Sequence, residues 1–386
     1  MTDTDVVVIG AGLVGGTFAL AASRIGLRVE LLSNAAPPLP PDRDPGRVYA
    51  LSPGSRALLQ SIGVWQRLEP ARIQPVLGMQ VHGDQPGTVL DLDALDGGVE
   101  ALAWIVESDA VAWALAEEIA TDGAVTCRSR AHPGSLRVDN DAAHVVLADG
   151  TSYRAALLVG ADGRDSWVRA EAGIQVRGRD YAHQGVVANF TAERAHGGIA
   201  RQWFLADGVL ALLPMPSNQV SMVWSAPDAV AADLMALDGD ALCARVMGAT
   251  GNCLGALRLV TPPSCLPITL GSARKLVGSR LALVGDAAHN LHPLAGQGVN
   301  LGLRDVDALC RILGADRRGE PGADSVLRRY ERSRREDVAT MIALTDGLQR
   351  LFSSRLPGIA WARNLGLDLV ARLPHLKGLL MQHALR

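Results

Sequence analysis

The residues best suited to chemistry in this sequence gather near its C-terminal end, over Leu281–Asp305. This stretch is typical of a buried strand, a Gly285–Asp286 turn, a loop rich in proline and glycine, and then a helix. Because glycine has no side chain, a backbone with many glycines can lie very close to a large flat ligand. The stretch therefore predicts a site for such a ligand beside an apolar strand.

A second glycine-rich turn lies near the other end of the chain. Gly10, Gly12 and Gly15 follow the apolar run Val6–Ile9 and open a helix expected over Leu13–Ile25. In this context the first glycine permits a tight turn, the second lets the backbone approach a pyrophosphate, and the third lets helix and strand pack closely. The free N–H groups and positive end of the helix favour phosphates. Together with the C-terminal stretch, this turn indicates a flavin dinucleotide.

The second strand of this unit, Leu27–Leu32, departs from the usual pattern at its end. An acid normally stands there, ~20 residues after the first glycine, and holds the adenosine ribose. Here that place falls at about Ser33, and Glu30 points to the opposite face of the strand. A neutral hydrogen bond in place of a charge-assisted one forgoes ~1 kcal/mol. We therefore expect a weaker hold on the ribose.

A third strand–turn–helix pattern lies in the middle of the chain. The apolar run Leu157–Val159 leads to the Asp162–Gly163 turn, and Arg164, Ser166 and Arg169 follow. An ordinary Asp–Gly turn is the alternative interpretation. The preceding buried strand and the following Arg-x-Ser-x-x-Arg distinguish this turn from most others.

These three turns, in this order and spacing, resemble those of the class A flavoprotein aromatic monooxygenases, which have the p-hydroxybenzoate hydroxylase-like fold. More narrowly, the run His292–Asp305 is similar to the signature of the ubiquinone-biosynthesis hydroxylases. The resemblance covers nearly the whole chain, and Ser33 is the clear departure from it. The family is thus suggested by motifs at both ends and in the middle of the sequence.

The resemblance implies an α/β fold with a Rossmann-like FAD-binding domain of discontinuous segments, an inserted, mostly antiparallel β-sheet substrate domain, and a C-terminal helical region. The sequence supports this organisation, because the glycine-rich turns lie at opposite ends of the chain. We expect the FAD-binding domain over residues 1–75, 100–173 and 270–350, the substrate domain over 76–99 and 174–269, and C-terminal helices over 351–386.

The resemblance also implies an FAD-dependent monooxygenase that hydroxylates the aromatic ring of a polyprenyl phenol or benzoquinol in ubiquinone biosynthesis, with O2 and through a flavin C4a-hydroperoxide. The flavin carries the chemistry, so we expect no catalytic residue of the protein itself. Only one dinucleotide fingerprint is present, which indicates that NAD(P)H binds transiently or that another protein donates electrons. The alternatives are a flavoenzyme acting on another aromatic or isoprenoid substrate, a NAD-dependent dehydrogenase, and a catalytically silent scaffold.

Residue roles follow from the same resemblance. Asp286 is expected to bond the ribityl chain, and the loop with the start of the next helix to lie against the isoalloxazine. Arg47 is expected near the flavin, and Asp162 near the cofactor and a transient nicotinamide donor. The expected cofactor-binding residues are Gly10, Gly12, Leu13, Val14, Gly15, Ser33, Arg47, Asp162, Gly285, Asp286, Pro293, Gly296, Gly298, Val299 and Asn300.

Aromatic and histidine residues allow two interpretations each. Trp203 and Trp224 fall on the inserted sheet and form either plain core or, with Pro293, a wall of the substrate pocket. His289 and His292 are expected to make structural hydrogen bonds to the backbone. A metal site is not expected, because no third ligand accompanies them.

Composition limits the partners and the location. A net charge of −3 gives no indication of nucleic acid as a partner. The acidic start of the chain and the lack of a run of ~20 apolar residues predict a cytoplasmic protein. Arg350–Arg386 holds six basic residues and one acid among apolar ones. This segment is either a packed helix pair or a peripheral contact with the inner membrane, where a prenylated substrate and a ubiquinone-biosynthesis protein assembly would be met.

Overall fold

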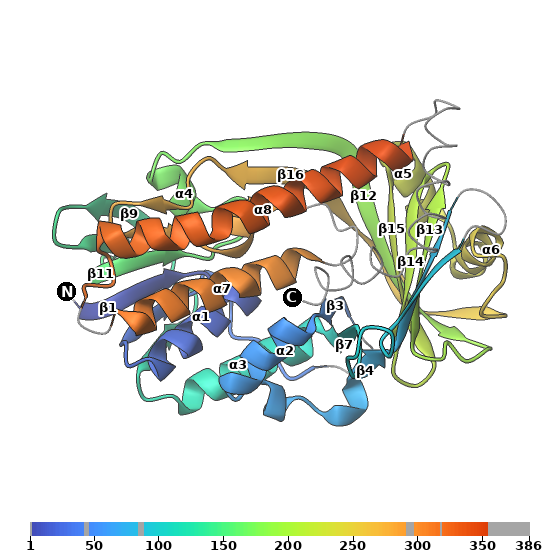
Figure 1. The fold of residues 1–386 in the computed structure, drawn as a ribbon, viewed down its shortest axis with the longest axis horizontal. Coiled ribbons are helices and arrows are strands. Elements are labelled where there is room, and N and C mark those ends of the chain that lie inside the picture. The colour runs from blue at the N-terminus through green and yellow to red at the C-terminus, as the bar shows by residue number, and fades with distance from the viewer. Residues whose placement is uncertain (1, 42–45, 84–88, 291–296, 317–318, 354–386) are drawn as a thin grey trace.

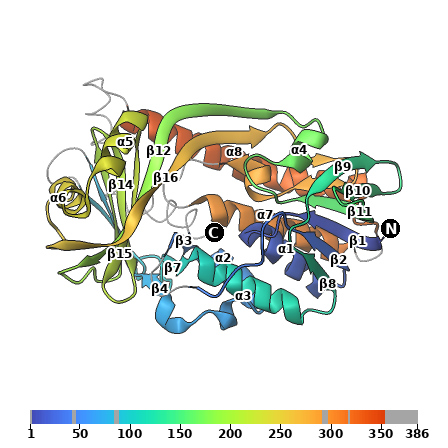
Figure 2. The same ribbon diagram turned by 180° about the vertical axis from the view of Figure 1, so that it is seen from behind.

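The computed structural model describes residues 2–41, 46–83, 89–290, 297–316 and 319–353 of the chain. Over these ranges the chain forms two eight-stranded sheets and one three-stranded sheet. Figure 1 shows the two large sheets at opposite ends of the molecule, with the small sheet between them. Figure 2, from behind, shows the two longest strands running from one end towards the other.

The first sheet is mainly parallel, and its central strands are runs of valine, leucine and isoleucine buried on both faces. Its strands are β1 (Thr2–Ile9), β2 (Val29–Leu32), β8 (Val125–Arg128), β9 (Pro133–Val138), β10 (Ala143–Leu147), β11 (Ser152–Gly160), β17 (Val277–Gly278) and β18 (Leu281–Leu283). The order is β17-β18-β11-β1-β2-β8, and β10 and β9 continue antiparallel from β11.

This order brings the three turn motifs together. Strand β11 lies between β1, from the start of the chain, and β18, from near its end, and both pairs are parallel. The carboxyl ends of parallel neighbours meet at one edge of a sheet, which is where such folds bind ligands. The turns after Ile9, Gly160 and Leu283 therefore lie side by side.

Helices cover the first sheet and carry one face of the site. They are α1 (Leu13–Arg24), α2 (Pro53–Ser61), α3 (Ser108–Thr121), α4 (Trp167–Glu171), α7 (Gln297–Ala315) and α8 (Asp324–Ser353). Helix α1 packs against α3 and α7, and α7 packs against α8. Gly16 of α1 allows the close approach of α3, because its missing side chain faces Leu115 and Ile119 of that helix.

The second sheet is antiparallel except where β13 pairs with β5. Its order is β19-β16-β12-β15-β14-β13-β5-β6. These strands are β5 (Gly78–His82), β6 (Val89–Asp93), β12 (Val176–Ala192), β13 (Ile199–Leu205), β14 (Gly208–Met215), β15 (Gln219–Pro227), β16 (Leu257–Ala273) and β19 (His289–Asn290). The small sheet consists of β3 (Val48–Leu51), β7 (Ala103–Glu107) and β4 (Gln74–Val76).

Helices α5 (Asp228–Ala236) and α6 (Gly239–Ala249) cover one face of the second sheet, and a separate apolar core fills the space beneath them. The mixed α/β architecture with one largely parallel and one largely antiparallel sheet confirms the predicted fold class. The domain boundaries stay a prediction. Residues 354–386, most of the expected C-terminal helical region, lie outside the described residues. No helix in the described ranges is long and apolar enough to cross a membrane.

Candidate active site

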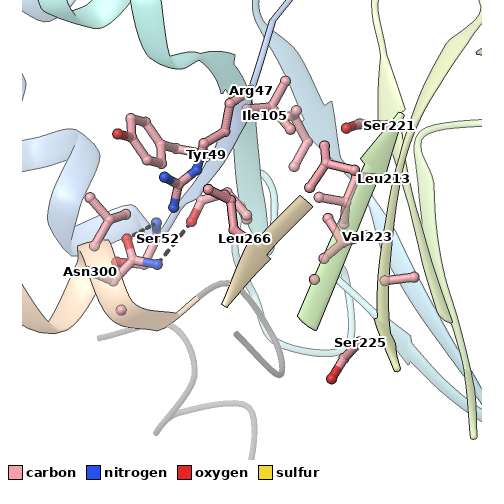
Figure 3. A pocket seen from close by; sticks show the side chains of 18 of the residues that line it. Arg47, Tyr49, Ser52, Ile105, Leu213, Ser221, Val223, Ser225, Leu266 and Asn300 are labelled. Atoms are coloured by element: carbon pink, nitrogen blue, oxygen red, sulfur yellow. Dashed lines mark hydrogen bonds between the residues drawn. The ribbon is translucent and has the colours of Figure 1, made fainter. Parts of the chain in front are cut away.

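A cavity of about 510 Å³ lies where the three turns face the open side of the second sheet. The start of α1, the Asp286 turn and the start of α7 line it from one side. In Figure 3, Arg47, Tyr49 and Asn300 lie on that side, and Leu213 and Val223 of the second sheet lie opposite. The cavity thus joins the predicted cofactor residues to the sheet that was predicted to bind substrate.

The glycines of the first turn divide into two kinds. Gly10 has a φ of +106°, and a Cβ there would lie 2.2 Å from the Ala161 carbonyl oxygen. A Cβ at Gly15 would lie 1.8 Å from the Gly10 carbonyl oxygen. The fold itself requires both glycines. A Cβ at Gly12 would meet nothing within 4 Å, and Gly12 lines the cavity together with Leu13, so its missing side chain leaves room for a ligand.

Asp286 projects from the third turn into the cavity. The preceding residue, Gly285, has a φ of +60°, and a Cβ there would press against Val14 at 3.2 Å. The Asp286 carboxylate is accessible from the cavity, but the surrounding protein takes it partly out of bulk water. This burial raises its pKa, and the charges of His289 and Arg47 act in the opposite direction. Asp286 is therefore an acceptor group held at the floor of the cavity.

A buried carboxylate behind this turn fixes its geometry. Asp305 on α7 is fully buried and accepts hydrogen bonds from the Gly285 N–H at 2.9 Å and from His289 Nε2 at 2.6 Å. Its other oxygen accepts from Arg334 Nε on α8 at 2.7 Å. We call these four residues the Asp305 network. The prediction that His289 bonds the backbone was wrong, because a charged partner on α7 takes its ring nitrogen; His292 lies outside the described residues.

The second and third turns are also joined to each other. Arg169 of α4 donates from Nη1 to the Ala287 carbonyl at 2.8 Å and from Nη2 to the Arg164 carbonyl at 2.7 Å. The Asp162 carboxylate accepts from Ser166 Oγ at 2.5 Å and from the Val168 N–H at 3.0 Å.

Asp162 therefore supports the start of α4, whose N-cap is Ser166, and it is not among the residues that line the cavity. Its contact with the cofactor region stays a prediction. Its carboxylate accepts from the Val168 N–H in the first turn of the helix, which has no partner within the helix. The backbone on either side, at Ala161 and Gly163, does reach the cavity.

The start of α7 is held by Asn300. Its Oδ1 accepts from the Ser52 N–H at 2.9 Å and from Ser55 Oγ at 2.8 Å, and its Nδ2 donates to the Ala50 carbonyl at 2.8 Å. Asn300, Gly298 and Val299 line the cavity. The first turn of a helix has free N–H groups and a partial positive charge, so this edge of the cavity favours an anionic or electron-rich group.

Arg47 and Tyr49 of the β3 segment complete this side. The Arg47 guanidinium carbon lies 5.6 Å from the centre of the Tyr49 ring, and both residues line the cavity. Burial raises the pKa of Tyr49, which keeps its phenol neutral. Sequence reasoning included Arg47 but missed Tyr49, although the Arg-x-Tyr spacing on one strand places both side chains on the same face.

Three further positions were predicted to bind the cofactor, namely Ser33, Pro293 and Gly296. Ser33 is buried beyond the end of β2, where its Oγ accepts from the Ala35 N–H at 3.2 Å, and it does not line the cavity. Pro293 and Gly296 lie outside the described residues. Their expected roles, like that of Ser33 towards the ribose, stay predictions.

The tryptophans predicted as pocket walls do not line the cavity. Successive side chains of a strand point to opposite faces. Val223 and Ser225 line the cavity, so Trp224 between them faces α5 and α6, and Trp203, next to Gln202, does the same. The prediction was wrong by one position in the strand alternation, and the alternative, plain core aromatics, is confirmed.

The second sheet instead meets the cavity with smaller side chains, which we call the sheet wall. Along the central strands its members alternate with core residues, as the register requires. The sheet wall consists of Gly185, Val187, Ala200, Gln202, Val209, Ala211, Leu213, Ser221, Val223, Ser225 and Leu266.

These residues fit FAD. Gly12 leaves room for a pyrophosphate at the start of a helix, Asp286 offers a carboxylate to hydroxyl groups, and the start of α7 offers N–H groups to an electron-rich ring edge. The described residues contain no group of three or more histidines, cysteines and acids arranged to hold a metal ion.

Comparison with known sequences places this geometry in a family. The profile of the FAD binding domain family matches residues 3–345. The ubiquinone hydroxylase UbiL of Rhodospirillum rubrum is 39% identical over 386 residues, covering 99% of this chain and 89% of that protein. The 3-demethoxyubiquinol 3-hydroxylase of Escherichia coli is 35% identical over 388 residues, covering 99% and 98%.

Among solved structures, Pseudomonas aeruginosa PqsL in complex with 2-aminobenzoylacetate has a similar fold. The TM-score is 0.80, with 22% sequence identity, 95% of this chain and 100% of that chain covered. At this identity the likeness concerns the fold alone.

Proposed function

This chain belongs to the FAD binding domain family and, within it, to the FAD-dependent hydroxylases of ubiquinone biosynthesis, and we propose that it hydroxylates a prenylated phenol or benzoquinol between its flavin site and the sheet wall. It is an oxidoreductase that uses O2 and a reduced electron donor.

One observation carries the proposal: a single cavity is lined by the turns that fit FAD and by the sheet wall. Most of the sheet wall is apolar, which suits a ring with a hydrocarbon tail. Among the described residues on that side, the charged one is Arg201. Its guanidinium is already bonded to the carbonyls of His196 and Ile199 and to Gln80.

When FAD is bound and reduced, it supplies the activation of O2 and the transfer of one oxygen atom to a ring carbon, while the other leaves as water. The protein binds and orients. Asp286 would accept hydrogen bonds from cofactor hydroxyls, and the N–H groups at the start of α7 would stabilise negative charge on the flavin ring. The apolar residues of the sheet wall keep water from the reacting atoms.

The donor of electrons is external in this proposal. The sequence carries one dinucleotide fingerprint, Gly10–Gly15, and the helix start behind it faces the cavity through Gly12 and Leu13. NAD(P)H would therefore bind transiently, or a reduced protein would take its place.

Rescue of ring-hydroxylation mutants tests the proposal and identifies the ring position. The gene is expressed in bacterial strains that each lack one ring hydroxylase of ubiquinone biosynthesis, and ubiquinone is measured by mass spectrometry. We expect restored ubiquinone in at least one strain. If the protein accumulates with bound FAD and restores none of them, a flavoenzyme acting on another substrate is the better interpretation. If the protein accumulates without FAD and restores ubiquinone in none of the strains, a catalytically silent scaffold is the better interpretation.

Contact with the membrane surface is the second part of the proposal. It rests on the basic and apolar composition of Arg350–Arg386. Co-sedimentation with phosphatidylglycerol vesicles compares the full chain with a chain ending at Ser353, and phosphatidylcholine vesicles are the control. We expect the full chain alone to sediment, and only with the anionic vesicles. Equal behaviour of the two chains would contradict this contact.

A further inference from the structure

The sheet wall holds one amide that the fold does not use. Gln202 on β13 is 8% exposed and lines the cavity. No described residue makes a hydrogen bond to its side chain. The strand register explains this isolation, because Gln202 lies beside Ala211 of β14 on one side and Val81 of β5 on the other. Along its own strand the neighbours on the same face are Ala200 and Phe204. An amide surrounded by apolar side chains thus faces the cavity.

A hydroxyl on the same wall is in the same condition. Ser221 on β15 is fully buried, and its Oγ has no hydrogen-bond partner among the described residues. Figure 3 shows Ser221 on the sheet side of the cavity with Leu213, its register partner on β14. Buried polar atoms elsewhere on this sheet, such as His82 Nε2 and Trp224 Nε1, also lack a hydrogen-bond partner among the described residues, but neither of these two residues lines the cavity. His196, by contrast, has both ring nitrogens bonded, to the Met215 carbonyl at 2.9 Å and the Gly198 N–H at 3.0 Å.

A side-chain amide with no protein partner can be satisfied only by water or a ligand in the cavity, and an apolar residue of similar size would need neither. A polar group that faces a cavity without a partner is therefore matched to a ligand. On a wall that is otherwise mostly apolar, it contacts the polar substituent of a largely apolar ligand. For a prenylated phenol, that substituent is an oxygen on the ring, because the tail offers none.

We propose that Gln202 is a specificity-determining residue that hydrogen-bonds the phenol oxygen of the substrate, with Ser221 as a second polar contact on the same wall. This inference rests on the proposed function. The amide can accept the phenol O–H through Oε1 and donate to the same oxygen through Nε2. By holding the ring oxygen at the sheet wall, Gln202 decides which ring carbon faces the flavin.

The test compares two ligands on the FAD-loaded full chain. A geranylated phenol and geranylbenzene differ only in the hydroxyl, and the dissociation constant of each is read from the change in flavin absorbance on titration. We expect the wild type to prefer the phenol by about 3- to 10-fold, the value of one neutral hydrogen bond. Gln202→Met, which keeps the length of the side chain, should bring that ratio close to one.

A matched control is available on the same sheet. Gln219 on β15 does not line the cavity, and Gln219→Met should keep the preference of the wild type. Gln202→Leu is the second variant if Gln202→Met does not retain flavin. The proposal is overturned if flavin-loaded Gln202 variants keep the wild-type preference, or if the wild type has none.

Product analysis separates this inference from the function on which it rests. Ring hydroxylation by the wild type together with an unchanged preference in the Gln202 variants would overturn the role of Gln202 alone. Absence of any hydroxylated ring product from the wild type, with either ligand and with full flavin, would overturn the proposed function.

Discussion

Asp305 Oδ2 accepts a hydrogen bond from His289 Nε2 at 2.6 Å, at a place where the two side chains are 0% and 1% exposed. The same carboxylate holds the Gly285 N–H and pairs with Arg334 of α8. Helices α7 and α8 are thus tied directly to the turn that carries Asp286. The position of Asp286, a predicted flavin ligand, therefore depends on a carboxylate that does not line the cavity.

Replacing this carboxylate should weaken the fold as well as the site. Asp305→Asn removes the fully buried countercharge of Arg334 and, among the described residues, leaves it paired only with the partly exposed Asp337, so we expect a loss of about 3 kcal/mol in the free energy of unfolding by urea. Bound FAD per protein should fall too. Asp307→Asn is the control, because Asp307 is exposed on the same helix and pairs only with exposed Arg311. Equal stability of the two variants would contradict the role given to Asp305.

The same carboxylate predicts a dependence on pH. Burial raises the pKa of Asp305, but the charges and hydrogen bonds of His289 and Arg334 outweigh burial and hold it below its ordinary value. Its stabilising contribution is therefore fully present above the pKa of an unfolded aspartate, about 3.9, and is lost as pH falls through the lower folded value.

Tyr330 of α8 also faces this carboxylate and stays neutral across this range, because burial raises its pKa well above the ordinary value. Urea midpoints measured from pH 6 to pH 3 should thus fall more steeply in the wild type than in Asp305→Asn. Parallel curves would show that another carboxylate is responsible.

The Asp305 network includes features that could be predicted from the sequence and contacts that could not. The turns and their order along the chain were predictable, because the glycines at 10, 12, 15 and 285 follow closely after apolar runs typical of buried strands. The side-chain partners of Asp305 could not be predicted, because His289 belongs to a two-residue strand and Arg334 to a separate helix later in the chain. Asp162 illustrates the same limit, since its support of the start of α4 depends on side-chain geometry.

Asp286 offers a direct test of cofactor retention. Asp286→Ala removes a carboxylate at the cavity floor, and loss of a charge-assisted hydrogen bond should weaken FAD binding by about 10- to 100-fold. Flavin should separate from this variant on gel filtration. Asp165→Ala removes a neighbouring carboxylate whose side chain is 88% exposed on the second turn, and it should keep flavin. Full retention of flavin by Asp286→Ala would show that other contacts hold the cofactor.

Two glycines of strand β12 have different roles: one leaves room for substrate in the cavity, and the other is required for the packing of the strand. A Cβ at Gly185, on the sheet wall, would come no closer than 3.7 Å to its neighbours, whereas one at Gly178 would lie 2.6 Å from the Leu270 carbonyl oxygen. Gly185→Val should therefore fold, keep FAD, and bind a geranylated phenol at least about tenfold more weakly by filling the cavity. Gly178→Val should lower the melting temperature instead. Unchanged binding by Gly185→Val would place the substrate elsewhere.

The sheet wall was the part of the site least accessible from the sequence. The sequence placed Trp203 and Trp224 correctly on the inserted sheet. The sequence did not predict which residues of strands β13 and β15 face the cavity, because a shift of one position exchanges the two faces of a strand. The large aromatic residues were predicted to form the pocket wall. Trp224 instead packs beneath α5 and α6, and Ser221 and Val223 lie on the cavity side of β15.

The central claim is that this chain places an aromatic ring where reduced FAD and O2 can hydroxylate it. The most direct measurement supplies the FAD-loaded protein with a reduced donor, a geranylated phenol and oxygen gas labelled with the heavy isotope, and follows products by mass spectrometry. The account predicts a new ring hydroxyl that carries one labelled oxygen atom. A protein that holds FAD, consumes the donor and releases labelled peroxide without labelling any prenylated ring offered to it would contradict the account.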